Sequence, residues 1–294
     1  MTHDARHPRA PVGALYLKRL YIRHAFSLSL IVLVSFVALA SSGPASAASP
    51  ASLDRRAVDE FVESQLDKHG IPGISLALIQ DGDIVYAKGY GTAGNGNSMT
   101  PDTPMGIGST AKPFTAIAIL QLVEEGVIVL DEPVQTYLPW FRVTDDEASE
   151  RITIRHLLHH TSGLSELGYN RVLNPEPTLE QGVRDLRLAR LTSPVGTKFQ
   201  YFNPNYSTLA LIVEEVSGET YGTYVREHIF EPLRMTNSYA SPNEALEAGM
   251  AQGHITLFGF PVARSQPFRR YMLGAGYLVS TARRLESPRH RHGQ

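Results

Sequence analysis

The chain of 294 residues has a formal net charge of −2, with 43% apolar and 19% charged residues, which is typical of a globular protein of one or two domains. The near-neutral charge gives no reason to expect a nucleic-acid partner. Because the sequence contains no cysteine, it excludes disulfides, thiolate metal sites and a cysteine nucleophile.

The first 47 residues predict an export segment. Basic residues between Arg6 and Arg23 precede an apolar run over 25–40, and Ala45-Ser46-Ala47 follows it. These are the three parts of a secretory signal peptide. The apolar run is shorter than the roughly 20 residues of a typical membrane-spanning helix, so cleavage is favoured over a retained N-terminal membrane anchor. In either case we expect an extracytoplasmic protein that is secreted, periplasmic or tethered to the outer face of the membrane.

A helix and a hairpin are predicted next. Apolar residues recur at helical spacing over 52–69, and Gly70 with Pro72 ends the segment. Two apolar, β-prone runs at 74–80 and 83–90 flank Asp81-Gly82, a strong signal for a two-residue hairpin turn. No convincing further strand is found to complete the sheet.

The region from Ser109 to about Leu233 is predicted to be mostly helical. The helix after Ser109 is apolar nearly all round, so we expect a buried central helix that ends at Gly126. Thr178 and Gln181 have the spacing of a capping box and start another helix. Two more helices are predicted at 206–216 and 220–230.

Ser109 and Lys112 carry the first candidate chemistry. In Ser109-Thr110-Ala111-Lys112 the hydroxyl and the amine lie one helical turn apart, and burial of Lys112 disfavours its ammonium form. A neutral amine can take the serine proton, while the helix N-terminus favours the anion formed when a serine attacks a carbonyl. The structural alternative is a helix-capping serine beside a solvated lysine, but this helix offers the lysine almost no polar face.

Tyr201-Phe202-Asn203 is the second candidate motif, which supplies a phenol and an amide to the same pocket. Alone it is equally consistent with a turn tyrosine and an asparagine before Pro204. His156, His159 and His160 have a spacing that two zinc ligands could use, but no recognisable metalloenzyme motif supplies a third. We therefore expect neither a metal nor a cofactor.

Taken together, the two motifs resemble those of the penicillin-recognising serine hydrolases, which include class C β-lactamases, D-alanyl-D-alanine carboxypeptidases and related esterases. Further stretches carry the resemblance: 106–109, 130–134, 154–164 and 275–282. It implies an α+β fold of the β-lactamase/transpeptidase type, in which an all-helical subdomain is inserted into an antiparallel-sheet subdomain.

The resemblance also implies roles for the four residues. Ser109 is the acylated nucleophile, Lys112 its base, Tyr201 the proton shuttle to the leaving group, and Asn203 a clamp on the substrate amide. The implied function is an exported serine hydrolase that forms an acyl-enzyme with an amide or ester: a β-lactam, a D-alanine peptide or another ester. Its partner is a small-molecule or peptide substrate, and only an uncleaved N-terminal segment would contact the membrane.

The sequence departs from the family near its end. Family members carry a third motif, K-T-G or H-x-G, on a strand that supplies a second oxyanion donor, and nothing after Tyr201 fits it. Lys68-His69-Gly70 comes close in spelling, but it precedes the hairpin and is interpreted as a helix C-cap. We therefore expect an incomplete hydrolase domain at 48–285 that lacks its C-terminal strands, a disordered basic tail at 286–294, and impaired activity. The alternative is an inactive truncated fragment or a cell-wall-binding module with a vestigial site.

Overall fold

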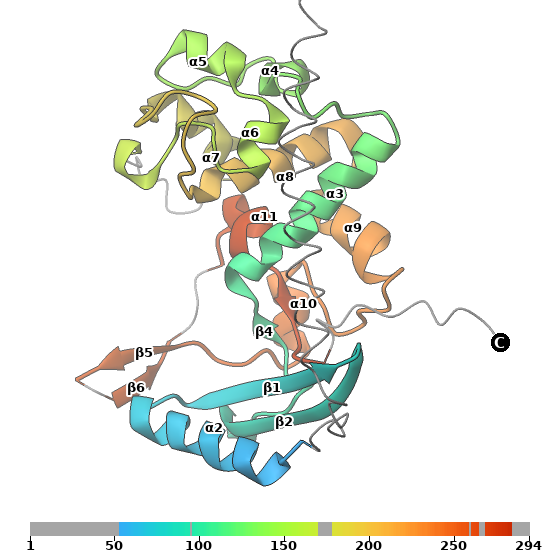
Figure 1. Cartoon of the computed structure of the whole chain (residues 1–294), viewed down its shortest axis with the longest axis vertical. Coiled ribbons are helices and arrows are strands. Elements are labelled where there is room, and N and C mark those ends of the chain that lie inside the picture. Colours follow the sequence, from blue (N-terminus) through green and yellow to red (C-terminus); the bar gives the residue numbers. More distant parts are fainter. Residues whose placement is uncertain (1–52, 95, 170–177, 259, 265–267, 284–294) are drawn as a thin grey trace, which may run out of the picture. The chain divides into compact units, whose positions relative to one another are not determined.

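A computed structural model describes residues 53–94, 96–169, 178–258, 260–264 and 268–283 (Figure 1). From Asp54 onward the described residues belong to one compact unit. The predicted signal segment at 1–47 and the predicted basic tail at 286–294 lie outside the described residues and stay predictions. Among the helices that are described, none has both the length and the apolar character needed to cross a membrane.

The predicted hairpin is present. β1 (Gly73–Gln80) pairs antiparallel with β2 (Asp83–Gly94), and the short β3 (Asn97–Ser98) adds a third strand beside β2. Asp81 and Gly82 have φ values of 54° and 83°. Positive φ at both central residues is the requirement of a type I′ turn, which an aspartate followed by a glycine adopts at little cost.

Helix α2 (Arg55–His69) packs beside this sheet and begins three residues later than predicted. Asp54 caps it by accepting the Ala57 N–H at 3.1 Å, and Gly70 ends it with φ 60°. The predicted C-cap is therefore confirmed. Asp59 on α2 contacts three polar side chains of β2, which ties the helix to the strand: Tyr86, Lys88 and Tyr90.

Helices fill most of the chain between β4 and β5. They are η1 (Gly108–Ala111), α3 (Lys112–Glu124), α4 (Val134–Tyr137), α5 (Asp146–Arg151), α6 (Ile154–Leu158), η2 (Glu166–Gly168), α7 (Leu179–Arg184), η3 (Asp185–Leu188), α8 (Asn203–Ser217), α9 (Tyr221–Val225), the π-helical turn η4 (Arg226–Phe230) and α10 (Pro242–Glu247). Thr178 and Gln181 form the predicted capping box of α7. The α+β class, with helices inserted after an antiparallel hairpin, is confirmed.

The central buried helix is α8 rather than α3. Ten consecutive α8 residues, 204–213, are buried, and six of them belong to the hydrophobic core: Tyr206, Leu209, Ala210, Leu211, Ile212 and Val213. On α3, Ile117 and Leu120 are 41% and 45% exposed, so the prediction of a buried central helix is wrong for one side of α3. The predicted end at Gly126 is confirmed by its φ of 75°. Apolar residues are common on solvent-facing helix surfaces. An apolar sequence therefore does not by itself show that every side of a helix is buried.

Five strands of the described residues were not predicted, namely the short β3 given above and four more. β4 (Met105–Gly106) pairs with β7 (Val279–Ser280), and β5 (His254–Leu257) pairs with β6 (Phe260–Ala263). Two-residue strands have no readable alternation, and β5 leads into Phe258 rather than into an Asn-Gly turn. Between β6 and β7 lie η5 (Arg270–Met272) and α11 (Leu273–Gly276).

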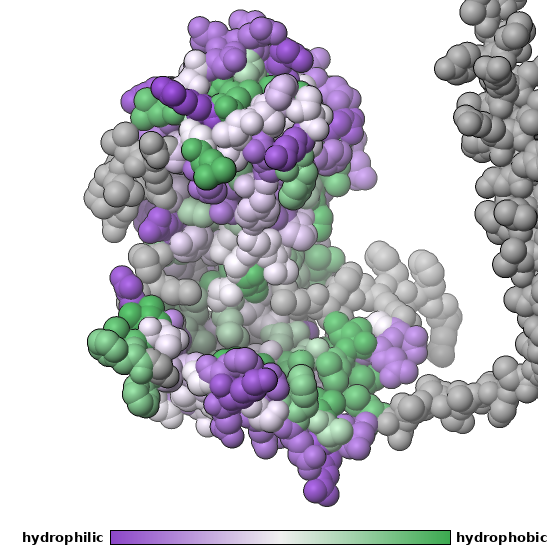
Figure 2. All heavy atoms as spheres, turned by 60° about the vertical axis from the view of Figure 1, so that its left-hand side comes forward, coloured by the Kyte–Doolittle hydropathy of each residue, from purple (hydrophilic) through white to green (hydrophobic). Residues whose placement is uncertain are grey.

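The β5–β6 hairpin contributes much of the exposed apolar surface. Figure 2 shows hydrophobic side chains at the surface of the part of the molecule that contains the strands. Five of this hairpin's apolar side chains are between 41% and 92% exposed: Ile255, Leu257, Phe258, Phe260 and Val262.

Candidate active site

Ser109 lies where a short strand turns into a helix. The Ile107 N–H, just after β4, donates to the Leu278 carbonyl at 3.0 Å, which extends the β4–β7 pairing to this point. Gly108 then takes φ 55°, a conformation that glycine adopts without steric cost, and the chain enters η1 and α3. Ser109 is exposed, and unpaired N–H groups at a helix start favour negative charge beside it.

Tyr201 and Asn203 lie on one side of an extended segment. Between them Phe202 has φ −148° and ψ 111° and is fully buried in the core. Side chains alternate in extended backbone, so anchoring Phe202 inside directs its two neighbours to the opposite side. Asn203 then starts α8. This local geometry explains why the motif has the form tyrosine, any residue, asparagine.

Lys112 is the centre of the site. Its side chain is buried, with 6% of its surface exposed, and its Nζ contacts three oxygen atoms. Nζ lies 2.9 Å from Asn203 Oδ1 and 3.3 Å from Ser109 Oγ, and it also donates to the Ala275 carbonyl. The structure therefore brings the four sequence-predicted site residues together, although they come from separate parts of the chain.

Tyr201 is hydrogen-bonded directly to Ser109. Their oxygen atoms lie 2.5 Å apart, and Lys112 Nζ is 4.7 Å from the centre of the Tyr201 ring. Partial burial raises the pKa of Tyr201, but the hydrogen bonds with Lys112 and Ser109 and the charge of Lys112 outweigh it. The pKa of Tyr201 therefore lies below its ordinary value. A phenol of this kind gives up its proton more readily than a free tyrosine.

Two contacts of the site were not predicted from the sequence. One is the Ala275 carbonyl on α11, a backbone atom that no side-chain pattern could reveal. The other is His160, whose Nδ1 accepts the Phe202 N–H at 3.2 Å and whose ring packs against Tyr201. Burial and then the charge of Lys112 lower the pKa of His160 to about 4, so this imidazole is neutral near pH 7.

Two of the three histidines considered as metal ligands, His156 and His160, have structural partners. His156 completes a capping box with Thr153 at the start of α6, and His160 contacts the backbone before α8. Within the part of the chain that the structure describes, no group of three histidine or acidic side chains is placed to hold a metal ion.

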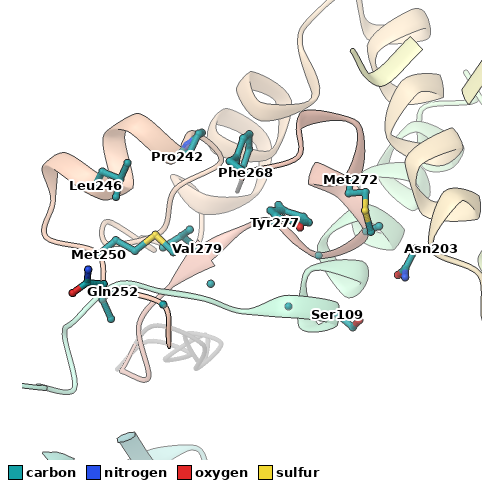
Figure 3. Close-up of a pocket in the computed structure, with 16 residues that line it drawn as sticks. Ser109, Asn203, Pro242, Leu246, Met250, Gln252, Phe268, Met272, Tyr277 and Val279 are labelled. Carbon is teal, nitrogen blue, oxygen red and sulfur yellow. The ribbon is translucent and has the colours of Figure 1, made fainter. Parts of the chain in front are cut away.

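A cavity of about 650 Å³ opens beside Ser109 (Figure 3). Ser109 and Asn203 lie at one end of it, while Leu246 and Met250 lie at the other. Met272 lies beside Asn203, and Tyr277 lies between the two ends. The volume lies within the range of small-molecule sites in proteins.

The chain matches one protein family over most of its described length. The profile of the family described as Beta-lactamase matches residues 58–287. Protein flp of Staphylococcus aureus strain MW2 is 29% identical over 233 residues, covering 78% of this chain and 47% of that protein. Penicillin-binding protein 4 of Amycolatopsis lactamdurans is 34% identical over 202 residues, covering 65% of this chain and 51% of that protein.

A solved structure agrees with these sequence matches. The octameric penicillin-binding protein homologue from Pyrococcus abyssi superposes with a TM-score of 0.69 at 34% identity, over 80% of this chain and 55% of that one. The fold thus matches the β-lactamase/transpeptidase type that the sequence motifs imply. The chain spans about half the length of the curated relatives described above.

Proposed function

The chain belongs to the beta-lactamase family, and we propose that it is a serine hydrolase that forms an acyl-enzyme on Ser109 with amide or ester substrates. The candidate substrates are a β-lactam, a D-alanine peptide or another ester. The proposed residues are Ser109 as nucleophile, Lys112 as base, Tyr201 as proton shuttle and Asn203 as substrate clamp.

The hydrogen bonds of Lys112 carry this proposal. A neutral amine has two N–H donors and one lone pair. Asn203 Oδ1 and the Ala275 carbonyl can only accept, so they take the two N–H groups. The lone pair is then left for Ser109 Oγ, the one partner of the three that can donate a proton. This arrangement suits a general base acting on a serine nucleophile.

The proposed reaction proceeds in two steps. In the first, Ser109 Oγ bonds to the substrate carbonyl carbon while its proton passes to Lys112 Nζ. The bond from that carbon to the leaving nitrogen or oxygen then breaks. Tyr201 gives its phenol proton to the leaving atom, and Lys112 Nζ passes the serine proton on to the Tyr201 oxygen. In the second step, water attacks the acyl-serine ester, the acid leaves, and Ser109 Oγ recovers a proton. The Ser109–Tyr201 hydrogen bond supports this proton route.

Export is part of the proposal. The basic region, the apolar run at 25–40 and Ala45-Ser46-Ala47 support a product outside the cytoplasm. Signal cleavage and retained anchoring remain the two routes to that location.

Ester hydrolysis by the whole chain tests the proposed function. We expect release of p-nitrophenol from p-nitrophenyl acetate, with the enzymatic rate abolished in Ser109→Ala. Ser64→Ala, which removes an exposed hydroxyl on α2, serves as the matched control and keeps the full rate. Equal rates for the wild type and Ser109→Ala would contradict the proposal and favour the inactive or wall-binding product.

A further inference from the structure

Among the residues that the structure describes, no charged side chain lines the cavity beside Ser109. Its lining is formed by glycine, alanine and proline backbone together with uncharged side chains: Ser109, Asn203, Leu246, Met250, Gln252, Phe268, Met272, Tyr277 and Val279. We infer that this cavity binds an uncharged, apolar acyl group, so that the preferred substrate is an ester or amide of a fatty or other apolar acid. This inference rests on the proposed function.

The position of Tyr201 assigns the cavity to the acyl side of the substrate. Tyr201 is hydrogen-bonded to Ser109 but does not line the cavity. If Tyr201 protonates the leaving atom, the leaving group lies beside it. The acyl group extends from the same carbonyl carbon in another direction, and the cavity that runs from Ser109 toward Leu246 and Met250 receives it (Figure 3).

The uncharged lining of the cavity disfavours substrates whose acyl group ends in a carboxylate. A carboxylate in an apolar cavity loses its hydration, and a cation must compensate for that loss. None of the residues that line this cavity supplies a cation. The nearby Lys112 does not line it, and its Nζ is already engaged by three oxygen atoms. We therefore expect weak binding of acyl groups that end in a carboxylate.

The shape of the lining suits chains of different length. Met250 and Met272 are flexible, polarisable side chains that adapt to apolar ligands. The volume of about 650 Å³ accommodates a medium-length alkyl chain and the reacting carbonyl. Each methylene that enters an apolar cavity strengthens binding, so the preference should grow with acyl length.

The primary test compares three p-nitrophenyl esters that differ only in the acid: acetate, octanoate and hemiglutarate. We expect kcat/KM for octanoate to exceed that for acetate by at least about tenfold, and hemiglutarate to be the poorest of the three. Equal values for octanoate and acetate, or a preference for hemiglutarate, would overturn the inference while leaving the proposed function intact.

A charge introduced at the far end of the cavity should reverse this preference. Leu246 is 65% exposed on α10, so Leu246→Arg adds a cation without burying it in the core. We expect at least about a tenfold shift of kcat/KM toward hemiglutarate relative to octanoate. Leu188→Arg places the same charge on an exposed leucine outside the cavity and leaves the ratio unchanged. An equal shift in both variants would overturn the inference.

Binding to Ser109→Ala tests the cavity without any reaction. We expect octanamide to bind more tightly than glutaric acid monoamide in calorimetric titrations, and Leu246→Arg in that background to reverse the order. This measurement tests the inference even if the wild type hydrolyses no ester. A lack of ester hydrolysis would contradict the proposed function but not the inference about the cavity. Tighter binding of the monoamide, or binding of neither compound, would overturn it.

Discussion

The ring of His160 lies against the ring of Tyr201, with centroids 4.7 Å apart and planes inclined by 36°. His160 is 6% exposed and takes φ 55°, an uncommon backbone conformation for a residue other than glycine. Through its Nδ1 it also fixes the backbone N–H of Phe202. One neutral imidazole therefore supports both the backbone and the ring of the motif that faces Ser109.

This burial predicts an acid-sensitive stability. The pKa of His160 is about 4 in the folded chain and near 6.5 when unfolded, so the unfolded state binds the extra proton between these values. Stability is therefore retained above about pH 6.5 and lost as the pH falls toward 4. We expect a contribution of about 2–3 kcal/mol to the loss between about pH 7.5 and 4.5, which urea unfolding at the two pH values measures.

His160→Asn isolates this contribution. Asparagine tolerates positive φ, and its side-chain oxygen can accept the Phe202 N–H, but it does not titrate. The difference between wild type and variant should therefore change with pH by the amount given above. Parallel stability curves for the two proteins would show that His160 does not titrate in this range.

Removing the Lys112 amine should abolish acylation. Lys112→Met keeps a similar side-chain length without a base, and we expect the acylation rate to fall by about 10³-fold. The substitution also leaves two buried oxygens without their donor, at a cost of about 1–3 kcal/mol, so a thermal melt must accompany the stopped-flow assay. Lys68→Met, on an exposed lysine of α2, provides the control. A folded Lys112→Met protein with an unchanged rate would exclude Lys112 as the base.

Tyr201→Phe should separate good leaving groups from poor ones. The ring over Lys112 is kept, whereas the hydroxyl that bonds to Ser109 is lost. A p-nitrophenolate is a good leaving group and needs no proton, whereas an alkoxide must be protonated as it leaves. We expect kcat/KM for an ethyl ester to fall by about 10²-fold or more, and that for the p-nitrophenyl ester of the same acid to fall much less. An equal fall for both esters would remove Tyr201 from the leaving-group step.

Gly274 should be intolerant of even one added methyl group. A Cβ at this position would lie 2.6 Å from the Ala210 Cβ and 3.0 Å from the Tyr206 carbonyl oxygen. We expect Gly274→Ala to destabilise the chain by about 1–3 kcal/mol and to reduce activity, because α11 also carries the carbonyl that holds Lys112.

Gly222→Ala is the matched control for Gly274→Ala. Its added Cβ meets nothing closer than 3.5 Å, so we expect a neutral or slightly stabilising effect in chemical unfolding. Equal effects of the two substitutions would contradict the close approach of α11 to α8.

Local patterns predicted the features that depend on neighbouring residues. The Asp81-Gly82 turn, the Gly70 C-cap and the Thr178 capping box are each determined within a few residues, and all three are present. The proximity of Ser109 and Lys112 likewise follows from one helical turn. Tyr201 could be placed beside them only through the family resemblance, because its position depends on how α8 packs.

Features that depend on distant backbone were not predictable. The Ala275 carbonyl reaches Lys112 because β7 pairs with β4, and neither two-residue strand has a pattern of its own. The exposed side of α3 was mispredicted because Ile117 and Leu120 are apolar at positions that face solvent. The role of His160 depends on a buried contact rather than on its spacing from other histidines.

Covalent labelling of Ser109 tests the central claim most directly. The whole chain and Ser109→Ala are each incubated with an alkyl fluorophosphonate, and the intact masses are recorded. We predict one added phosphonyl group on the wild type, located on Ser109 by peptide mapping, and none on Ser109→Ala. An unlabelled wild type, or equal labelling of both proteins, would contradict the assignment of Ser109 as an activated nucleophile.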